Sequence, residues 1–162
     1  GTRVLVAINL DALLQQAVEE VALAVNAEYV KILEYCPGSK KLLIRAGVGW
    51  KEGVVGHATL AVHMRSPAGR SYLTNEPTRI TDIRQSEEFD YSDLLKEHGV
   101  ISLVNVPIAW DGHTYGVLEI DSRSANFDLN LQLTETPRGI AGCIAAFVSA
   151  SSTAARKSSA KC

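Results

Sequence analysis

The amino-acid sequence predicts an α+β domain in which an antiparallel sheet is covered by helices on one face and by an irregular segment on the other. Three observations predict it. An amphipathic helical pattern stands near each end of the chain, and apolar runs joined by short turns stand between them. A long glycine-dotted stretch separates these runs and keeps many apolar residues. Short turns join neighbouring antiparallel strands, so these parts together favour a layered α+β fold.

The first fifty residues predict a helix and a strand pair. Apolar residues recur at helical spacing over residues 10–25, with Asn9 or Asp11 as the N-terminal cap. Residues 27–35 then alternate as a strand does, and "CPGSKK" supplies a turn. Residues 42–49 return as the second strand.

Residues 50–98 form the irregular middle segment. It is rich in glycine, with a short strand at 77–83 and a short helix that Ser92 caps. Long irregular stretches inside compact domains are usually functional or disordered. The many apolar side chains of this segment argue against disorder and predict a functional covering layer.

The stretch "HGVISLVNVPIAWDGHTYGVLEIDS", residues 98–122, predicts a β-hairpin around the Asp111-Gly112 turn. Alternate residues of its first strand are apolar on both faces. A strand of this kind is buried on both sides, so we expect a layer of structure above and below it.

A closing helix is predicted at about 137–149, with Pro137 in its first turn. Gly139 and Gly142 weaken it, since glycine in a helix costs on the order of 1 kcal/mol relative to alanine. Residues 151–162 have no core-forming pattern and are predicted to be a flexible tail. We therefore expect one domain over residues 1–150.

Composition excludes several classes of protein. The net charge of −2 gives no general attraction to nucleic acid or to an anionic membrane. No apolar run approaches the roughly 20 residues that span a bilayer, and no signal peptide is evident. The three cysteines, Cys36, Cys143 and Cys162, are scattered, which predicts free core or surface thiols and no disulfide framework. We expect a cytosolic domain.

The sequence resembles the GAF family of small-molecule-sensing and dimerisation domains. The resemblance rests on "GVISLVNVPI", a short turn, "YGVLEIDS" and then Phe127, with "AEYVKILEY", "AGVGW" and "EPTRITDI" ahead of "SDLLKEHGV". It covers roughly residues 10–148 and looks most like GAF domains of bacterial two-component sensor histidine kinases. It implies a central antiparallel sheet of five or six strands, terminal helices on one face, and a ligand pocket under the irregular middle segment.

The resemblance implies a non-catalytic sensory domain that forms a homodimer through its terminal helices and passes a signal to an output domain of the same polypeptide. The full-length parent would be a histidine kinase. Leu14 and Val18, on the apolar helix face, are expected at the dimer interface. Two alternatives stay open: a GAF-like thiol enzyme acting on a small molecule, and a purely structural dimerisation module without ligand.

The sequence lacks the cysteines by which some GAF-like domains attach a cofactor or catalyse a reaction. Some GAF-like domains attach a bilin through a cysteine in the segment that here reads "KEHGVIS", which has none. Residues 50–98 also lack the cysteines that GAF-like methionine sulfoxide reductases use. We expect no cofactor, no catalytic residue and no metal site, because His57 and His63 lack further converging ligands.

Seven residues are candidates for ligand contact, with aromatic side chains supplying apolar area and polar ones fixing orientation. They are Trp50, His57, Asp82, Phe89, His98, Ser102 and Asn105. Each has a competing structural interpretation. Trp50 and Phe89 would pack in the covering layer, and Asp82 and His98 would cap local structure. Ser102 and Asn105 would bond to neighbouring backbone.

Overall fold

The computed structural model describes residues 9–125, 135–150 and Cys162. It is an α+β fold built on one antiparallel sheet of six strands in the order β3-β2-β1-β6-β5-β4. The strands are β1 (Tyr29–Cys36), β2 (Lys41–Val48), β3 (Thr59–Ala61), β4 (Thr78–Ile80), β5 (Ser102–Trp110) and β6 (His113–Ser122). The helices are α1 (Leu10–Val25), α2 (Pro67–Thr74), α3 (Asp93–Glu97) and α5 (Glu135–Ala150), with a 3₁₀ turn η1 at Ile83–Gln85. The predicted fold class is confirmed.

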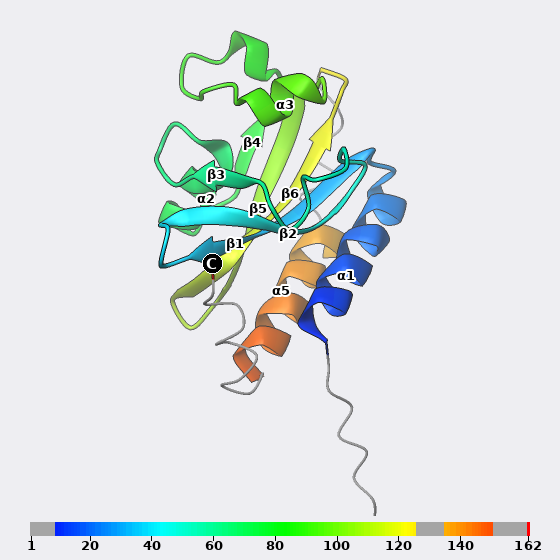
Figure 1. Cartoon of the computed structure of the whole chain (residues 1–162), viewed down its shortest axis with the longest axis vertical. Helices are drawn as coiled ribbons and strands as arrows, with labels where there is room; N and C mark the ends of the chain where they lie inside the picture. The colour runs from blue at the N-terminus through cyan, green and yellow to red at the C-terminus, as the bar shows by residue number, and fades with distance from the viewer. Residues whose placement is uncertain (1–8, 126–134, 151–161) are drawn as a thin grey trace, which may run out of the picture.

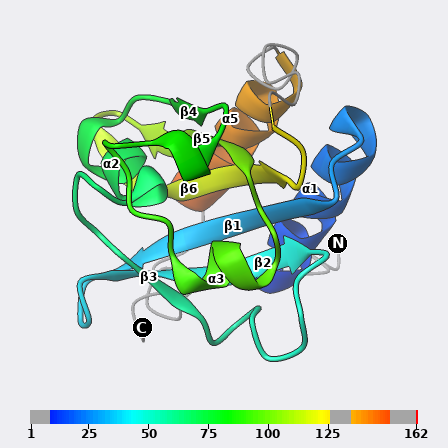
Figure 2. The same cartoon turned by 90° about the horizontal axis from the view of Figure 1, so that it is seen from above.

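The sheet separates two layers (Figure 1). Helices α1 and α5 lie side by side on one face, where they pack with β1, β5 and β6 around a single large apolar core. The middle segment, with α2 and α3, covers the other face above two smaller apolar clusters, as the view from above shows (Figure 2). We call this covering segment, residues 50–98, the roof.

Helix α1 begins where the sequence predicts. The side chain of Asn9 accepts hydrogen bonds from the backbone N–H groups of Asp11 and Ala12, which identifies Asn9 as the cap. Leu14 and Val18 are fully buried against the sheet. The expectation that these two residues form a dimer interface is therefore wrong, because the apolar face of α1 is used for the core of its own domain.

The central hairpin is also confirmed. Asp111 and Gly112 both have positive φ, as a two-residue turn matched to the twist of the strands requires. Gly116 allows β6 to approach β1 closely, since a Cβ there would lie 1.9 Å from the carbonyl oxygen of Leu33. Strands β1 and β6 thus form the tightly packed centre of the sheet.

The closing helix α5 runs over residues 135–150 and is close to its predicted bounds. Gly139 and Gly142 lie where a Cβ would meet no neighbouring atom, so they do not mark close contacts. The predicted flexible tail, 151–162, lies outside the described residues except for Cys162. Among the helices that the structure describes, none is both long enough and apolar enough to cross a lipid bilayer.

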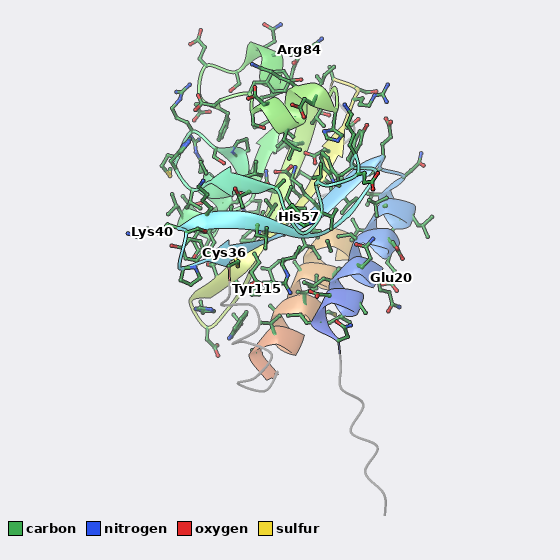
Figure 3. The ribbon with its side chains drawn as sticks, in the orientation of Figure 1. Glu20, Cys36, Lys40, His57, Arg84 and Tyr115 are labelled. Carbon is green, nitrogen blue, oxygen red and sulfur yellow. A yellow bond between two sulfur atoms is a disulfide. The ribbon has the colours of Figure 1, made fainter. Side chains whose placement is uncertain are left out.

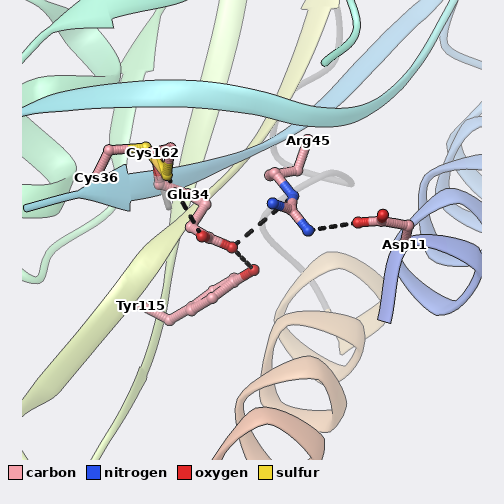
Figure 4. Close-up of a disulfide and its surroundings, with 6 residues drawn as sticks. All are labelled: Asp11, Glu34, Cys36, Arg45, Tyr115 and Cys162. Atoms are coloured by element: carbon pink, nitrogen blue, oxygen red, sulfur yellow. Dashed lines mark hydrogen bonds and ion pairs between the residues drawn. A yellow bond between two sulfur atoms is a disulfide. The ribbon is translucent and has the colours of Figure 1, made fainter. Parts of the chain in front are cut away.

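The prediction of three free thiols is wrong. Cys36, at the end of β1, forms a disulfide with Cys162 (Figure 4). Cys143 is free and exposed on α5. Beside the disulfide, Tyr115 donates a hydrogen bond to the buried carboxylate of Glu34. A separation of 126 residues gives the pair no local sequence signal. The disulfide removes one reason to expect a cytosolic location, and that location stays a prediction.

The disulfide predicts a simple labelling pattern. Iodoacetamide should add to Cys143 alone before reduction and to all three cysteines after denaturation and reduction, because only Cys143 has a free thiol. Intact-mass measurement distinguishes one adduct from three. Three adducts on unreduced, unfolded protein would contradict the pairing.

Candidate functional site

A row of residues crosses the roof-side face of the sheet. The strand register aligns Thr78, Asn105, Glu119, Lys31 and Gly47, one from each of five adjacent strands. Residues paired in this way have Cβ atoms about 4.5–5.5 Å apart. The row therefore brings an amide, a carboxylate and an ammonium group together in the middle of the domain.

Lys31 and Glu119 form a buried ion pair at the centre of this row, with Asp121 beside them. The Lys31 Nζ atom contacts Glu119 Oε2 and lies 3.2 Å from Asp121 Oδ2. All three side chains are almost completely shielded from solvent. Buried charges of this kind are stable only when they are paired, so we call Lys31, Glu119 and Asp121 the buried charge cluster.

Trp50 closes the cluster on one side. Its ring lies 4.3 Å from Lys31 Nζ, and its Nε1 donates a 2.9 Å hydrogen bond to the backbone oxygen of Val30. Gly47 makes room for it, since a Cβ there would lie 2.6 Å from the indole Cδ1. Lys31 and Trp50 therefore form a cation–π contact, and Gly47, the member of the row on β2, leaves space for the indole ring.

The protonation of the cluster follows from its burial. Burial and the negative charge of Glu119 raise the pKa of Asp121 well above 3.8, and the attraction of Lys31 opposes them without cancelling them. Burial alone would lower the pKa of Lys31, but the attraction of Asp121 and Glu119 outweighs it, so the pKa of Lys31 is raised. Folding therefore makes Asp121 easier to protonate, while Lys31 keeps its proton more firmly.

A cavity of about 230 Å³ lies between the buried charge cluster and the roof. Lys31 and Glu119 are at its floor. The roof contributes mostly small or apolar side chains and a few polar ones: Leu60, Ala61, His63, Ser66, Pro67, Ala68, Asp90, Ser92 and Leu95. A cavity with apolar walls and a few convergent polar groups is typical of a small-molecule site.

Asn105 is next to this floor and lacks partners. It is fully buried, and neither its amide nitrogen nor its amide oxygen has a hydrogen-bond partner among the described residues. Native proteins rarely leave such a group unsatisfied, because it loses its bonds to water on folding. Asn105 does not line the cavity itself, but its cross-strand partner Glu119 does, so a water beside the cavity floor can satisfy the unpaired amide.

The structure brings two of the seven sequence-predicted residues to the buried charge cluster. Trp50 covers Lys31, and Asn105 adjoins Glu119 in the cross-strand row. Phe89 is buried in the roof, with the Arg70 guanidinium 4.1 Å from the centre of its ring.

His98 has a structural role in the roof. Its Nδ1 donates to the carbonyl oxygen of Leu94, and its Nε2 accepts a 3.1 Å bond from the backbone of Lys51. It therefore ties the end of α3 to the segment after β2. It also packs edge-on against Tyr29 and Trp50.

The other three predicted residues lie elsewhere. Ser102 is on the opposite face of β5 from Asn105 and donates to the carbonyl oxygen of Ser124. Asp82 caps η1 and pairs with Arg84, which Figure 3 shows at one end of the molecule, far from Cys36. His57 is exposed. Asp82 and Ser102 thus have the local structural roles that competed with ligand contact.

Sequence reasoning missed Lys31, Glu119 and Asp121. The available signal was a charged residue inside a strand whose neighbours on both sides are apolar, as in "VKI" and "LEI". Because both faces of this sheet are covered, a charge in that position is buried. Within the described ranges, no group of three histidine, cysteine, aspartate or glutamate side chains could hold a metal ion.

Comparison with known proteins agrees with this architecture. The family model for the GAF domain matches residues 9–151. The GAF domain from a phosphoenolpyruvate-protein phosphotransferase of Coxiella burnetii is 19% identical, with a TM-score of 0.76 over 96% of this chain and 89% of that one. No curated protein sequence matches the chain.

Two further solved structures share the fold. Residues 122 to 287 of a methyl-accepting chemotaxis protein are 20% identical, with a TM-score of 0.71 over 88% of this chain and 90% of that one. The type II free methionine-R-sulfoxide reductase from Thermoplasma acidophilum is 18% identical, with a TM-score of 0.66 over 85% of this chain and 94% of that one. At these identities the likeness concerns the fold alone.

The raised pKa of Asp121 predicts a pH dependence of stability. A carboxyl group whose pKa is raised by folding contributes stability that is present below its unfolded pKa and is lost as pH rises through its folded pKa. The free energy of unfolding of the wild type should therefore fall, relative to that of Asp121→Asn, by up to about 1.4 kcal/mol per pH unit above pH ~4. Urea titrations of both proteins across this range measure the difference. Parallel stability curves would mean that Asp121 is ionised in the folded protein.

Proposed function

The chain belongs to the GAF domain family, and from that premise we propose that it is a non-catalytic small-molecule-sensing domain of a bacterial signal-transduction protein. GAF domains are a sensory and regulatory fold found in signalling proteins. The observation that carries the proposal is the cavity of about 230 Å³ between the roof and the buried charge cluster. A domain that served only as a rigid connector would have no need of buried charges beside an internal space.

The cost of the buried charge cluster supports a binding role. Removing an ammonium and a carboxylate from water is expensive, and replacing such a pair with apolar residues is often neutral or stabilising. Two apolar side chains in place of Lys31 and Glu119 would therefore stabilise the fold about as well. Their position at the floor of a cavity fits selection for ligand contact.

The same strands connect the cavity to the helical layer. Lys31 lies between Val30 and Ile32, which pack on the other side of the sheet in the core that α1 and α5 share. Glu119 lies likewise between two residues of that core on β6. A ligand that moves the floor would bias the packing of the terminal helices, to the extent that its affinity differs between the two arrangements.

The enzyme alternative finds little support in the positions of the cysteines. Cys36 is paired in a disulfide, and Cys143 is on α5, across the sheet from the cavity. Thus no free thiol lines the cavity within the part of the chain that the structure describes. The cavity itself favours the sensor over the alternative of a purely structural dimerisation module with a collapsed pocket.

We propose a two-component sensor histidine kinase as the parent protein, on the resemblance of the sequence to GAF domains of such kinases. The same fold occurs in a phosphotransferase and in a chemotaxis protein. The coding sequence that flanks this segment tests the assignment directly, since a kinase parent requires a histidine-kinase output domain downstream.

Blocking the cavity tests the binding role. Ala61 lines the cavity and is exposed, so Ala61→Trp should fill the entrance with little effect on folding. Native mass spectrometry of freshly purified wild type should show a retained small molecule, which Ala61→Trp loses. Ala24→Trp, on the exposed side of α1, is the matched control and should retain it. Retention of the same molecule by Ala61→Trp, or wild type free of any, would count against the proposal.

We also propose a homodimer through the outer surface of the terminal helices. Leu23 on α1 is 85% exposed, which makes it an apolar group suited to burial against a second copy. Leu23→Glu should shift the molecular mass measured by light scattering from dimer towards monomer while leaving the thermal midpoint unchanged. Leu14→Glu should unfold the domain, because Leu14 is in the core. Equal masses for the wild type and Leu23→Glu would contradict an interface at this surface.

A further inference from the structure

The cavity floor carries no net charge. Lys31 and Glu119 are the charged residues at the floor, and they form an ion pair with each other. At the cavity entrance, Asp90 is paired with Arg65 at 2.8 Å. A ligand with a single charge would add an unbalanced charge to a shielded site, which is costly. The electrostatic balance therefore favours a ligand whose own charges sum to zero.

The unpaired amide of Asn105 indicates which hydrogen-bonding groups the ligand carries. It offers two N–H donors and one oxygen acceptor, none of which has a partner among the described residues. Glu119, its cross-strand neighbour, lines the cavity and offers a carboxylate as acceptor. A head group that both donates and accepts hydrogen bonds would match these two side chains together, whereas a pure acceptor would meet the negative charge of Glu119.

The walls of the cavity indicate the chemistry of the ligand beyond its head group. Leu60, Ala61, Pro67, Ala68 and Leu95 give the cavity an apolar side above its polar floor. A volume of about 230 Å³ is below the usual range for sites that hold drug-sized ligands. A short apolar tail fits this space, and a nucleotide does not.

Resting on the proposed sensory function, we infer that the cavity binds a small, net-neutral molecule with a short apolar tail and a head group that both donates and accepts hydrogen bonds. A zwitterionic amino acid and a primary carboxamide share this chemistry. Glu119 receives the N–H donors of the head group. The amide of Asn105, which does not itself line the cavity, pairs with the oxygen of the head group through a bridging water.

A panel with one shared tail tests this inference by isothermal titration calorimetry. The probes are leucine, isovaleramide, isovalerate and isoamylamine, with nitrate as a small anion. Leucine or isovaleramide should bind at least about tenfold more tightly than isovalerate, isoamylamine or nitrate, since each of the latter lacks half of the head group or its neutrality. Which of the first two binds more tightly distinguishes the zwitterion from the carboxamide.

The failures of the inference and of the proposed function are distinguishable. Tight binding of isovalerate, isoamylamine or nitrate would overturn the neutral head group while leaving a sensory pocket. Binding of none of the five probes would also overturn the inference. The proposed function is then tested separately by native mass spectrometry. A retained small molecule supports it, and wild type free of any counts against it.

A variant of Asn105 separates recognition from stability. Asn105→Leu removes an unpaired buried amide, so it should leave the thermal midpoint of the unliganded protein unchanged or raise it. Its affinity for the tighter probe should fall about tenfold. Asn105→Ala removes the same amide without adding bulk, and it replaces Asn105→Leu if that variant does not fold.

Ser122→Ala is the matched control. Ser122 is a buried polar residue on β6, the strand of Glu119, and it accepts a hydrogen bond from the backbone of Ser124. Its side chain alternates to the helical face, away from the cavity, so its loss should leave affinity unchanged. Wild-type affinity in both folded Asn105 variants would overturn the role of Asn105 and with it the inference.

Discussion

The ion pair between Lys31 and Glu119 is the interaction on which the other features of the site depend. It lies on the two central strands, and both partners are almost completely buried. Burial of this kind requires that the roof stay closed over the sheet, because a buried charge without its partner costs about 3–5 kcal/mol. Trp50 lies over Lys31, and His98 in turn packs against Trp50, so the roof is built around the pair.

The alternation of side chains along β1 and β6 gives each strand two functions. On one face, Val30, Ile32 and their counterparts on β6 complete the core with the terminal helices. On the other face, residues one position away supply the charged floor of the cavity. Because both sets belong to the same rigid strands, the site and the helical layer are mechanically continuous. This continuity is what the proposed sensory function requires of the sheet.

Much of the fold could be predicted from the sequence, because it depends on local patterns. Helical spacing predicted α1 and α5, Asp111-Gly112 predicted the hairpin turn, and two-sided hydrophobicity predicted the two covering layers. The site depended on strand register, which pairs residues far apart in the chain. Lys31 and Glu119 become neighbours only through that register, and Cys36 meets Cys162 only through the path of the whole chain. Ser102 and Asn105 looked alike as candidates, and three positions along β5 put them on opposite faces.

A double-mutant cycle on the ion pair tests the central claim most directly. The free energies of unfolding of wild type, Lys31→Met, Glu119→Gln and the double variant would be measured by urea titration near neutral pH. If the pair is buried and interdependent, Lys31→Met loses about 3–5 kcal/mol. Glu119→Gln loses less, because Asp121 remains 3.2 Å from Lys31 Nζ, and the double variant loses clearly less than the sum of the two. Losses that add to within about 0.5 kcal/mol would contradict a buried pair at the centre of the sheet.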